Sequence, residues 1–295
     1  MSLSTSTLPA NWKSAVVSPV FKKGSASDPS NYRPISLTST SCKILESILK
    51  DTILDHLLKN GLLSKQQHWF LAKRSTPTQL LDCCKDWMQH INRNSQTDII
   101  YLDFAKAFDS VVHSKLLLKL ERYGIDGLTL KGINAFLTNR TQKVKVGSHM
   151  SSSSVVTSGV PQGSVLGPVL FLIFINDICN LPNFDVNMKL FADDVKLYLT
   201  LKDKVGSDKI QKLLDSISQW CNEWQLNLSP SKCVVLSLGR TPSKFMYNIN
   251  NLPIQHVNNF KDLGVTIDPL LNFESHINEI CSKANQRAAL ILKYF

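Results

Sequence analysis

Long apolar segments, a cysteine framework and an apolar leader are all absent from this sequence of 295 residues. The longest greasy run, VLGPVLFLIFI, contains Gly167 and Pro168 and is too short to span a bilayer, so we expect a buried helix and no membrane partner. The seven cysteines are an odd number without CxxC spacing, which argues against zinc and against a disulfide framework. The opening MSLSTSTLPANWK does not resemble a signal peptide. We therefore expect an intracellular protein with reduced thiols, in the nucleus, the cytoplasm or both, rather than a secreted one.

Internal repeats and long low-complexity linkers are missing as well, which argues against domains arranged as beads on a string. The four serines at 151–154 are the only biased patch, and the β-like runs on either side of them predict a hairpin loop. Apolar residues make up 43% of the chain and charged residues 19%, as in ordinary folded proteins. We expect folded lobes that are interleaved along the chain.

Positive charge is in excess, with 33 Lys and Arg against 23 Asp and Glu and a net charge of +10. This excess points to a polyanionic partner. It is concentrated in 1–75 and 113–150, whereas 98–112 and 176–203 each carry a net charge of −2. A metal site within a phosphate-binding surface would have this pattern, although scattered solvated charges also produce it.

The hydrophobic periodicity predicts helices and strands in irregular alternation. Helical spacing is found over 42–59, from the cap at 75–76 to residue 91, and over 114–122, 127–138, 164–178, 208–224 and 275–292. Strand-like runs occupy 15–21, 98–104, 143–147, 155–159, 188–192, 195–200, 233–238 and 245–250. Because no regular βαβ order is present, we expect the α+β class with a mainly antiparallel sheet.

Two adjacent carboxylates interrupt an apolar run in KLFADDVKLYL, at Asp193 and Asp194. The apolar runs on either side leave two residues between them, so one interpretation is a β-hairpin with an ordinary Asp-Asp loop. The functional interpretation is that the hairpin presents both carboxylates to a divalent cation, which offsets their repulsion. A third ligand is needed to decide between the two.

A third carboxylate occurs in DIIYLDFAKAFDSVVH, where a β-branched and aromatic strand ends at Asp103. A single Asp at such a position is usually a helix cap or a loop residue. If this strand pairs with the hairpin, however, Asp103 would lie beside Asp193 and Asp194, and three carboxylates suit two Mg²⁺ ions. Such a site favours phosphoryl or nucleotidyl transfer.

Five motifs occur in an order that is specific for one family: NYRPISL, YLDFAKAFDSV, SGVPQGSVLGPVLFLIFINDI, FADDVKLY and WQLNLSPSKC. The chain resembles the reverse transcriptase domain of non-LTR (LINE-type) retrotransposons from NWKSAVVSPVFKKG to FKDLGVTID. The resemblance implies a right-hand polymerase fold with an antiparallel palm sheet, mixed helical and β fingers and an incomplete thumb. The implied borders are an N-terminal tail at 1–10, fingers at 11–98, palm at 99–124, a fingers/palm insertion at 125–158, palm at 159–250, and primer grip with the start of the thumb at 251–295.

The resemblance also implies an activity, RNA-directed DNA polymerization, which is a nucleotidyl transfer from dNTPs to the 3′-hydroxyl of a DNA primer on an RNA template. Its metal ligands are Asp103, Asp193, Asp194 and the backbone carbonyl of Phe104, and they would hold two Mg²⁺ ions, with Mn²⁺ as a substitute. Lys232 falls on the family's lysine that acts as general acid for pyrophosphate.

Substrate contacts follow from the same motifs. Phe108 falls on the aromatic position that excludes a 2′-hydroxyl and so selects deoxynucleotides. Gln162 and Gly163 fall on the loop that supports the nucleotide and the template, and the basic residues expected at the triphosphate are Arg33, Arg74 and Lys73. Read without the family, these residues are a core aromatic, a Pro/Gly turn before a helix and solvated surface charges. Asp109 is expected to cap the following helix.

Two positions depart from the family pattern Gln-x-Gly-Phe-Arg: Trp69 stands where Gly is expected and Leu71 where Arg is common. If position 69 requires a positive φ, Trp69 would strain the turn by about 1 to 3 kcal/mol. Two alternatives therefore accompany the polymerase hypothesis. One is a catalytically inactive nucleic-acid-binding remnant, and the other is an RNA-directed RNA polymerase, which Asp109 favours and Phe108 opposes.

Overall fold

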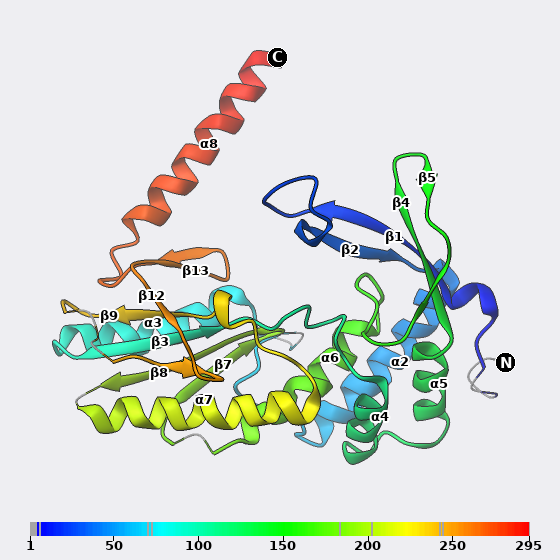
Figure 1. The fold of residues 1–295 in the computed structure, drawn as a ribbon, viewed down its shortest axis with the longest axis horizontal. Coiled ribbons are helices and arrows are strands. Elements are labelled where there is room, and N and C mark those ends of the chain that lie inside the picture. Colours follow the sequence, from blue (N-terminus) through cyan, green and yellow to red (C-terminus); the bar gives the residue numbers. More distant parts are fainter. Residues whose placement is uncertain are drawn as a thin grey trace. The chain divides into compact units, whose positions relative to one another are not determined.

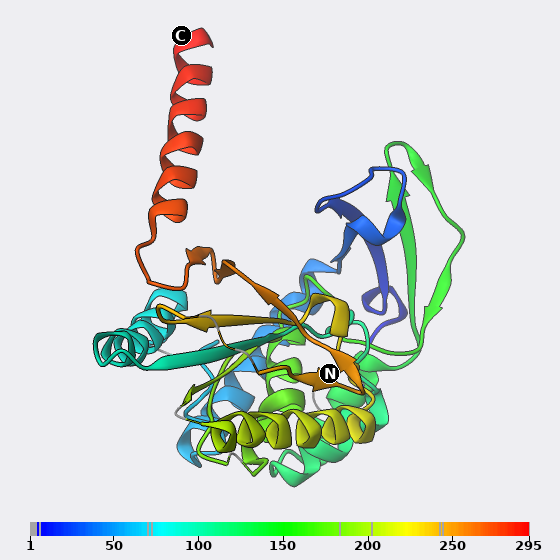
Figure 2. The ribbon, with the colours of Figure 1, turned by 60° about the vertical axis from the view of Figure 1, so that its left-hand side comes forward.

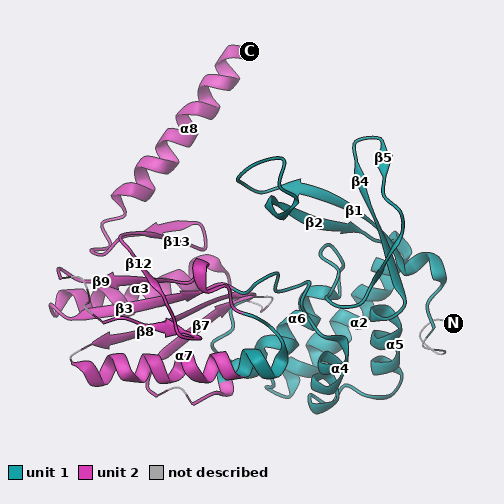
Figure 3. Ribbon diagram, in the orientation of Figure 1, with its two compact units in different colours: residues 1–70, 104–179, 220–227 teal, residues 71–103, 180–219, 228–295 magenta. Residues whose placement is uncertain are grey.

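The polypeptide passes several times between two units, which Figure 3 colours separately. Unit 1 contains 1–70, 104–179 and 220–227, and unit 2 contains 71–103, 180–219 and 228–295. The lobes are thus interleaved along the chain, as expected. The borders predicted for fingers, palm and thumb do not coincide with this division and stay a prediction.

The computed structural model describes residues 5, 7–69, 71, 73–182, 184–201, 203–241, 243 and 245–294. Of the predicted N-terminal tail, residues 1–4 and 6 lie outside this description. Across the described residues, no helix combines the length and the apolar character needed to cross a membrane.

Unit 2 is built on a five-stranded sheet with the order β12-β9-β3-β8-β7, which Figure 1 and Figure 2 show from two directions. The central strand β3, Gln96–Leu102, pairs antiparallel with β8, Asp194–Leu201, and with β9, Val234–Leu238. The strand β7, Asn187–Phe191, pairs antiparallel with β8, and β12, Gln255–Val257, pairs parallel with β9. Six of the seven residues of β3 are buried, which matches its β-branched and aromatic sequence.

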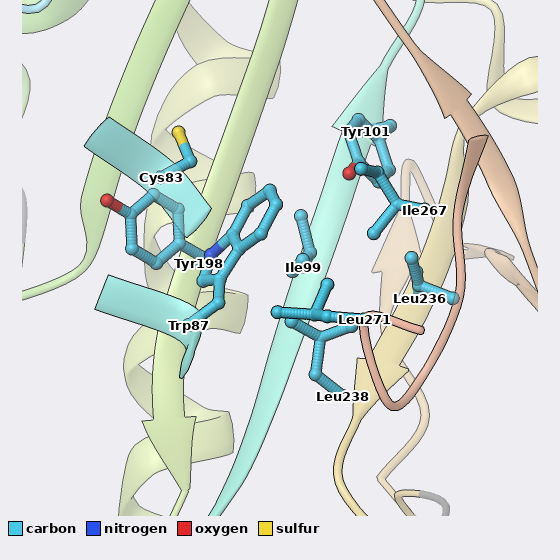
Figure 4. Close-up of a cluster of buried hydrophobic side chains, with 9 residues drawn as sticks. All are labelled: Cys83, Trp87, Ile99, Tyr101, Tyr198, Leu236, Leu238, Ile267 and Leu271. Carbon is cyan, nitrogen blue, oxygen red and sulfur yellow. The ribbon is translucent and has the colours of Figure 1, made fainter. Parts of the chain in front are cut away.

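One face of this sheet packs against α3, Thr76–Asn92, and against the hairpin of β13, Phe260–Asp262, and β14, Val265–Ile267. Figure 4 shows the side chains that fill this layer, with Trp87 from α3 packed edge-on against Tyr198 from β8 at 5.7 Å between ring centroids. On α7, Lys204–Trp224, Gln211 donates to the carbonyl of Asn248. The remaining elements of unit 2 are β10, Asn248–Ile249, β11, Leu252–Pro253, the 3₁₀ turn η4, Pro230–Lys232, and α8, Glu274–Tyr294.

Asp98 is buried on the opposite face of the unit 2 sheet. It precedes Ile99 along β3, and adjacent residues of a strand point to opposite faces. Its carboxylate accepts hydrogen bonds from the Ser237 hydroxyl at 2.7 Å and the Tyr247 hydroxyl at 2.8 Å, and from the Gln96 amide at 3.3 Å. Three donors satisfy most of the acceptor positions of a carboxylate that has no access to water. Asp98 is therefore a structural acid, and the negative charge of 98–112 is not all directed at a ligand.

We predict that Asp98→Ala lowers the free energy of unfolding by about 3 kcal/mol, because two buried donors and one part-buried donor lose their acceptor. Asp98→Asn keeps one acceptor oxygen and should cost less. Urea unfolding monitored by circular dichroism measures both changes. If Asp98→Ala unfolds at the same urea concentration as the unmodified chain, this cluster does not stabilise the sheet.

Unit 1 contains a second sheet, in which β1, Ser14–Phe21, pairs antiparallel with β2, Tyr32–Leu37, and parallel with β4, Arg140–Val146. Short strands β5, His149–Met150, and β6, Ser154–Val156, complete it by pairing with β4. Its helices are α2, Thr40–Lys59, α4, His113–Arg122, α5, Gly127–Leu137, and α6, Gly167–Asn176, with 3₁₀ turns η1, Ala10–Trp12, η2, Pro29–Asn31, and η3, Asp177–Asn180.

Helix α6 is the buried helix expected from the apolar run VLGPVLFLIFI, since every residue of the helix except Pro168 is buried. It begins at Gly167 rather than at 164, because the Ser164 hydroxyl forms a local turn by donating to the Pro161 carbonyl and accepting from Gly167. The buried Glu46 of α2 accepts from the backbone N–H groups of Val165 and Leu166, just before the helix. A carboxylate at this end also complements the helix dipole.

The α+β class with mainly antiparallel pairing is confirmed, but several short strands were not expected. Strand β2 contains Pro34, and β12, β13 and β14 have three residues each, too few for a periodic signal. The strand predicted at 245–250 is wrong in extent, because only Asn248 and Ile249 pair.

Candidate active site

The hairpin that carries Asp193 and Asp194 turns one residue earlier than the sequence suggested. Phe191 pairs with Asp194, so the two loop residues are Ala192 and Asp193, and the predicted Asp-Asp loop is wrong. Ala192 has a φ of 57°, the positive value required at the first central position of a type II′ turn. This conformation costs a residue other than glycine about 1 to 2 kcal/mol. The turn therefore stores strain next to the two carboxylates.

The register of β3 and β8 brings Asp103 and Asp194 to the same end of the sheet. Leu102 pairs with Val195, so one further step of the register sets Asp103, the first residue after β3, across from Asp194, the first residue of β8. Residues that face each other across an antiparallel pair point to the same side of the sheet. The sequence-based pairing of these two acids is therefore matched by the topology of unit 2.

Asp103 is held by the segment that precedes β9. Its carbonyl accepts a hydrogen bond of 2.7 Å from the Ser229 N–H, and its own N–H donates to the Cys233 sulfur at 3.4 Å. The Lys232 ammonium lies 3.4 Å from the Asp103 carboxylate, and both side chains are partly exposed. This ammonium faces the Oδ2 atom of Asp103, which is buried and accepts no hydrogen bond. An oxygen with this environment can accept a further cation.

Asp194 is surrounded by other acids. The pKa of its carboxyl is raised to about 6, first because nearby protein atoms reduce its solvation and then because Asp193, Asp262 and Asp103 are negatively charged. Lys196 acts in the opposite direction. Solvent screens part of this repulsion, since Asp194 is exposed. A site that raises the pKa of a carboxyl in this way favours a bound cation.

The donor set fits a divalent cation, although the side chains do not converge into a finished site. Within the described part of the chain, no three His, Cys, Asp or Glu side chains lie close enough to hold a metal ion together. Mg²⁺ is often bound by one or two carboxylates together with substrate phosphates, which Asp103 and Asp194 can provide for. The third carboxylate, Asp193, and the carbonyl of Phe104 stay predictions as ligands.

In unit 1, Phe108 is held between two other aromatic rings. It stacks on Phe171 of α6 with 4.4 Å between centroids and an interplanar angle of 18°, and Trp69 meets it edge-on at 6.0 Å. Phe171 is fully buried, whereas Phe108 keeps part of its surface accessible. Phe108 is therefore a fixed ring with one accessible portion, as a steric gate requires.

The strain expected at Trp69 is not found, because this residue is not among the non-glycine residues with positive φ. Its backbone N–H instead donates to the Gln67 side chain at 3.0 Å. The tryptophan that replaces the family's glycine thus uses its ring to pack against Phe108.

The loop with Gln162 and Gly163 is attached to the turn after Asp103 and to β2. The Gln162 amide donates to the Asp109 carboxylate at 3.1 Å, and the Gln162 carbonyl accepts from the Ser36 N–H at 2.7 Å. Asp109 is therefore not a helix cap as predicted; α4 follows Val112 without a side-chain cap. Burial raises the pKa of Asp109, while the Gln162 bond lowers it. Gln162 thus has a partner in this structure, and its role toward a template stays a prediction.

Gly163 is required by its close approach to β2. Its φ is 109°, and a Cβ atom built there would lie 2.7 Å from the Ser36 carbonyl oxygen. We predict that Gly163→Ala lowers the free energy of unfolding by about 2 kcal/mol or more, because it combines a forbidden φ with a backbone clash. Thermal unfolding measures the change. Gly132→Ala, in the interior of α5 with open space around it, is the control and should be neutral or stabilising.

The basic candidates belong to different units. Arg33 is exposed on β2 in unit 1, opposite Val20. Lys73 and Arg74 immediately precede α3 in unit 2, where Ser75 forms a capping box with Thr78. The structure leaves their predicted contact with a triphosphate untested.

Sequence reasoning missed the ion pair of Lys196 and Asp262. These side chains are 3% and 4% exposed, and the Tyr101 hydroxyl donates to the same carboxylate at 3.3 Å. The Tyr101 ring also stacks on Phe260, with 4.0 Å between centroids. The available signal was Lys196 two residues after Asp194, since this spacing puts both on one face of a strand.

The chain is similar to proteins of one family over most of its length. The family profile described as reverse transcriptase (RNA-dependent DNA polymerase) matches residues 20–267. The RNA-directed DNA polymerase from mobile element jockey of Drosophila melanogaster is 32% identical over 281 residues, covering 92% of this chain and 31% of the relative. The probable RNA-directed DNA polymerase from transposon X-element of the same organism is 29% identical, covering 95% and 32%.

Solved structures show the same fold at lower identity. An apo telomerase from Candida tropicalis, truncated from its C-terminal domain, superposes with a TM-score of 0.62 and 13% identity. This match covers 90% of the present chain and 55% of the telomerase chain. The chain spans about a third of the length of the curated relatives that it matches.

Proposed function

This chain belongs to the reverse transcriptase (RNA-dependent DNA polymerase) family, and from that premise we propose that it extends the 3′-hydroxyl of a DNA primer with dNTPs on an RNA template. It has the α+β right-hand polymerase fold of that family. The observation that carries the proposal is the register of β3 and β8, which sets Asp103 across from Asp194 beside a cation, the Lys232 ammonium. The matched relatives from a mobile element and a transposon support a retrotransposon origin.

We infer that Asp103 and Asp194, together with Asp193 and the Phe104 carbonyl, hold two Mg²⁺ ions, for which Mn²⁺ can substitute. Bound there, the ions would activate the primer hydroxyl and stabilise the leaving pyrophosphate. Two observations support this inference. The buried Oδ2 of Asp103 accepts no hydrogen bond and already faces a cation, the Lys232 ammonium, and the pKa of Asp194 is raised by reduced solvation and by its acidic neighbours. We propose that Lys232 donates a proton to the pyrophosphate, and its position beside Asp103 supports this role.

For the substrate we propose that Phe108 excludes ribonucleotides, since its ring is fixed between Phe171 and Trp69. Gln162 and Gly163 would support the nucleotide and the template. Arg33, Lys73 and Arg74 would bind the triphosphate, as their positive charge favours phosphate.

Primer extension on an RNA template with Mg²⁺ and dNTPs tests this function. The unmodified chain should extend the primer, and Asp193→Asn should not. If the unmodified chain binds an RNA/DNA hybrid without extending it, the inactive remnant is the better account. If the unmodified chain extends the primer with ribonucleotides in preference to dNTPs, the RNA-directed RNA polymerase is the better account.

We also propose that the chain acts inside the cell, in the nucleus, the cytoplasm or both. This part of the proposal is tested by localising the tagged chain in cells.

A further inference from the structure

The two carboxylates of the proposed metal site continue two rows of side chains on one face of the unit 2 sheet. Along β3, Tyr101 and Asp103 are two residues apart, and along β8, Lys196 and Asp194 are two residues apart. Alternate residues share a face, and two residues span about 7 Å along a strand. Tyr101 pairs directly with Lys196. The Tyr101 and Lys196 pair therefore lies one step below the Asp103 and Asp194 pair.

Asp262 contacts both members of the lower pair. Its Oδ2 atom accepts from the Lys196 ammonium and from the Tyr101 hydroxyl, the latter at 3.3 Å. The Lys196 ammonium also lies 6.0 Å from the centroids of the Tyr101 and Trp87 rings. Burial and the charge of Asp262 raise the pKa of Tyr101, so its hydroxyl remains a donor. The lysine is thus enclosed on one side by rings and paired on the other.

We propose that Asp262 is a positioning residue that keeps the Lys196 ammonium paired with itself and away from Asp194, and so leaves the Asp194 carboxylate available for Mg²⁺. This inference rests on the proposed function. The Lys196 side chain shares its face with Asp194, and its charge already acts on that carboxyl. An ammonium group released from Asp262 therefore has Asp194 as an acceptor one step along the same face, where it competes directly with a metal ion.

The proposal separates Asp262 from an ordinary structural ion pair. A purely structural pair would change the melting temperature when broken and would leave the affinity for a metal unchanged. If the pair instead keeps the Lys196 ammonium away from the metal-binding carboxylate, metal binding should weaken when Asp262 alone is removed. The loss of metal affinity should then disappear once Lys196 is removed as well, because the competing ammonium is absent.

The test uses the whole chain and three variants, Asp262→Asn, Lys196→Met and the double variant. Mn²⁺ alone is the probe, and its binding is followed by the loss of the free-ion electron paramagnetic resonance signal. The Mg²⁺ concentration for half-maximal primer extension is the second readout. Asp86→Asn is the matched control, since Asp86 accepts from the Tyr198 hydroxyl at 2.8 Å, further down the same face. Circular dichroism and melting curves establish that each variant folds.

We expect Asp262→Asn to weaken Mn²⁺ binding about tenfold and to raise the required Mg²⁺ similarly, a change of about 1.4 kcal/mol. The double variant should return to within about twofold of the unmodified chain, whereas Asp86→Asn should alter only the melting temperature. Unchanged Mn²⁺ affinity in a folded Asp262→Asn overturns this inference alone. A double variant that binds Mn²⁺ as weakly as Asp262→Asn also overturns this inference. An unmodified chain that binds no Mn²⁺ overturns the proposed function and this inference together.

Discussion

Asp194→Asn is expected to reduce primer extension by about a thousandfold while it raises the melting temperature of the metal-free chain. The loss of activity corresponds to about 4 kcal/mol of transition-state stabilisation, in the range that a metal ligand provides. The gain in stability arises because nearby protein atoms reduce the solvation of the Asp194 carboxylate and because Asp193, Asp262 and Asp103 repel it. The gain should be less than about 1 kcal/mol, since solvent screens an exposed group.

The pH dependence of this gain has a definite sign. The pKa of Asp194 is about 6 in the folded chain and near 3.8 when unfolded. The folded state therefore binds more protons between these values, and the ionised carboxylate is destabilising above pH 6. The advantage of Asp194→Asn should be largest near pH 7 and should disappear as the pH falls to about 4. Melting curves in chelator at several pH values measure it.

Asp208→Asn is the control, because Asp208 is an exposed carboxylate on α7. It should change neither primer extension nor the melting temperature. A metal-free Asp194→Asn chain that melts lower than the unmodified chain at pH 7 would contradict the repulsion that we assign to this site.

The second large effect is expected at Phe108. We predict that Phe108→Val raises the ratio of kcat/KM for ribonucleotides to that for deoxynucleotides by about a hundredfold, because the smaller side chain leaves room for a 2′-hydroxyl. Incorporation of dNTPs should fall by less than about tenfold, since Phe171 and Trp69 continue to fill the neighbouring volume.

Single-nucleotide incorporation with matched dNTP and rNTP pairs measures this ratio. Phe21→Val is the control, since Phe21 is a half-exposed ring of unit 1 that packs on Tyr32. Its ratio should equal that of the unmodified chain. Equal sugar selectivity in Phe108→Val, with dNTP incorporation retained, would assign Phe108 to packing alone.

The sequence was sufficient for the parts of the fold with a strong period. The strands around Asp103 and Asp194 were expected because β-branched and apolar residues surround them. Their pairing was posed only as the condition under which the acids would meet, and the register of β3 and β8 supplies it. The turn could not be located to the residue, because the strain at Ala192 is decided by the register of β7 and β8 rather than by local propensity.

The hydrophobic periodicity and the motifs do not predict contacts between residues that are far apart in the sequence. Asp98 was counted only in the negative charge of 98–112, and its donors, Tyr247 and Ser237, come from segments that only the folded sheet brings to it. Lys196 and Asp262 are separated by 66 positions in the chain and have no periodic signal in common. Trp69 looked like a strained substitution because the family has glycine at that position, and its ring contact with Phe108, which belongs to another motif, had no signal in the sequence.

The most direct test of the central claim is a crystal structure of the chain with primer, RNA template, a non-hydrolysable dNTP and Mn²⁺, with anomalous data. The account predicts anomalous peaks about 2.1 Å from carboxylate oxygens of both Asp103 and Asp194, bridging to the triphosphate. A bound triphosphate with Mn²⁺ on its phosphates, but with neither carboxylate in the coordination sphere, would contradict it.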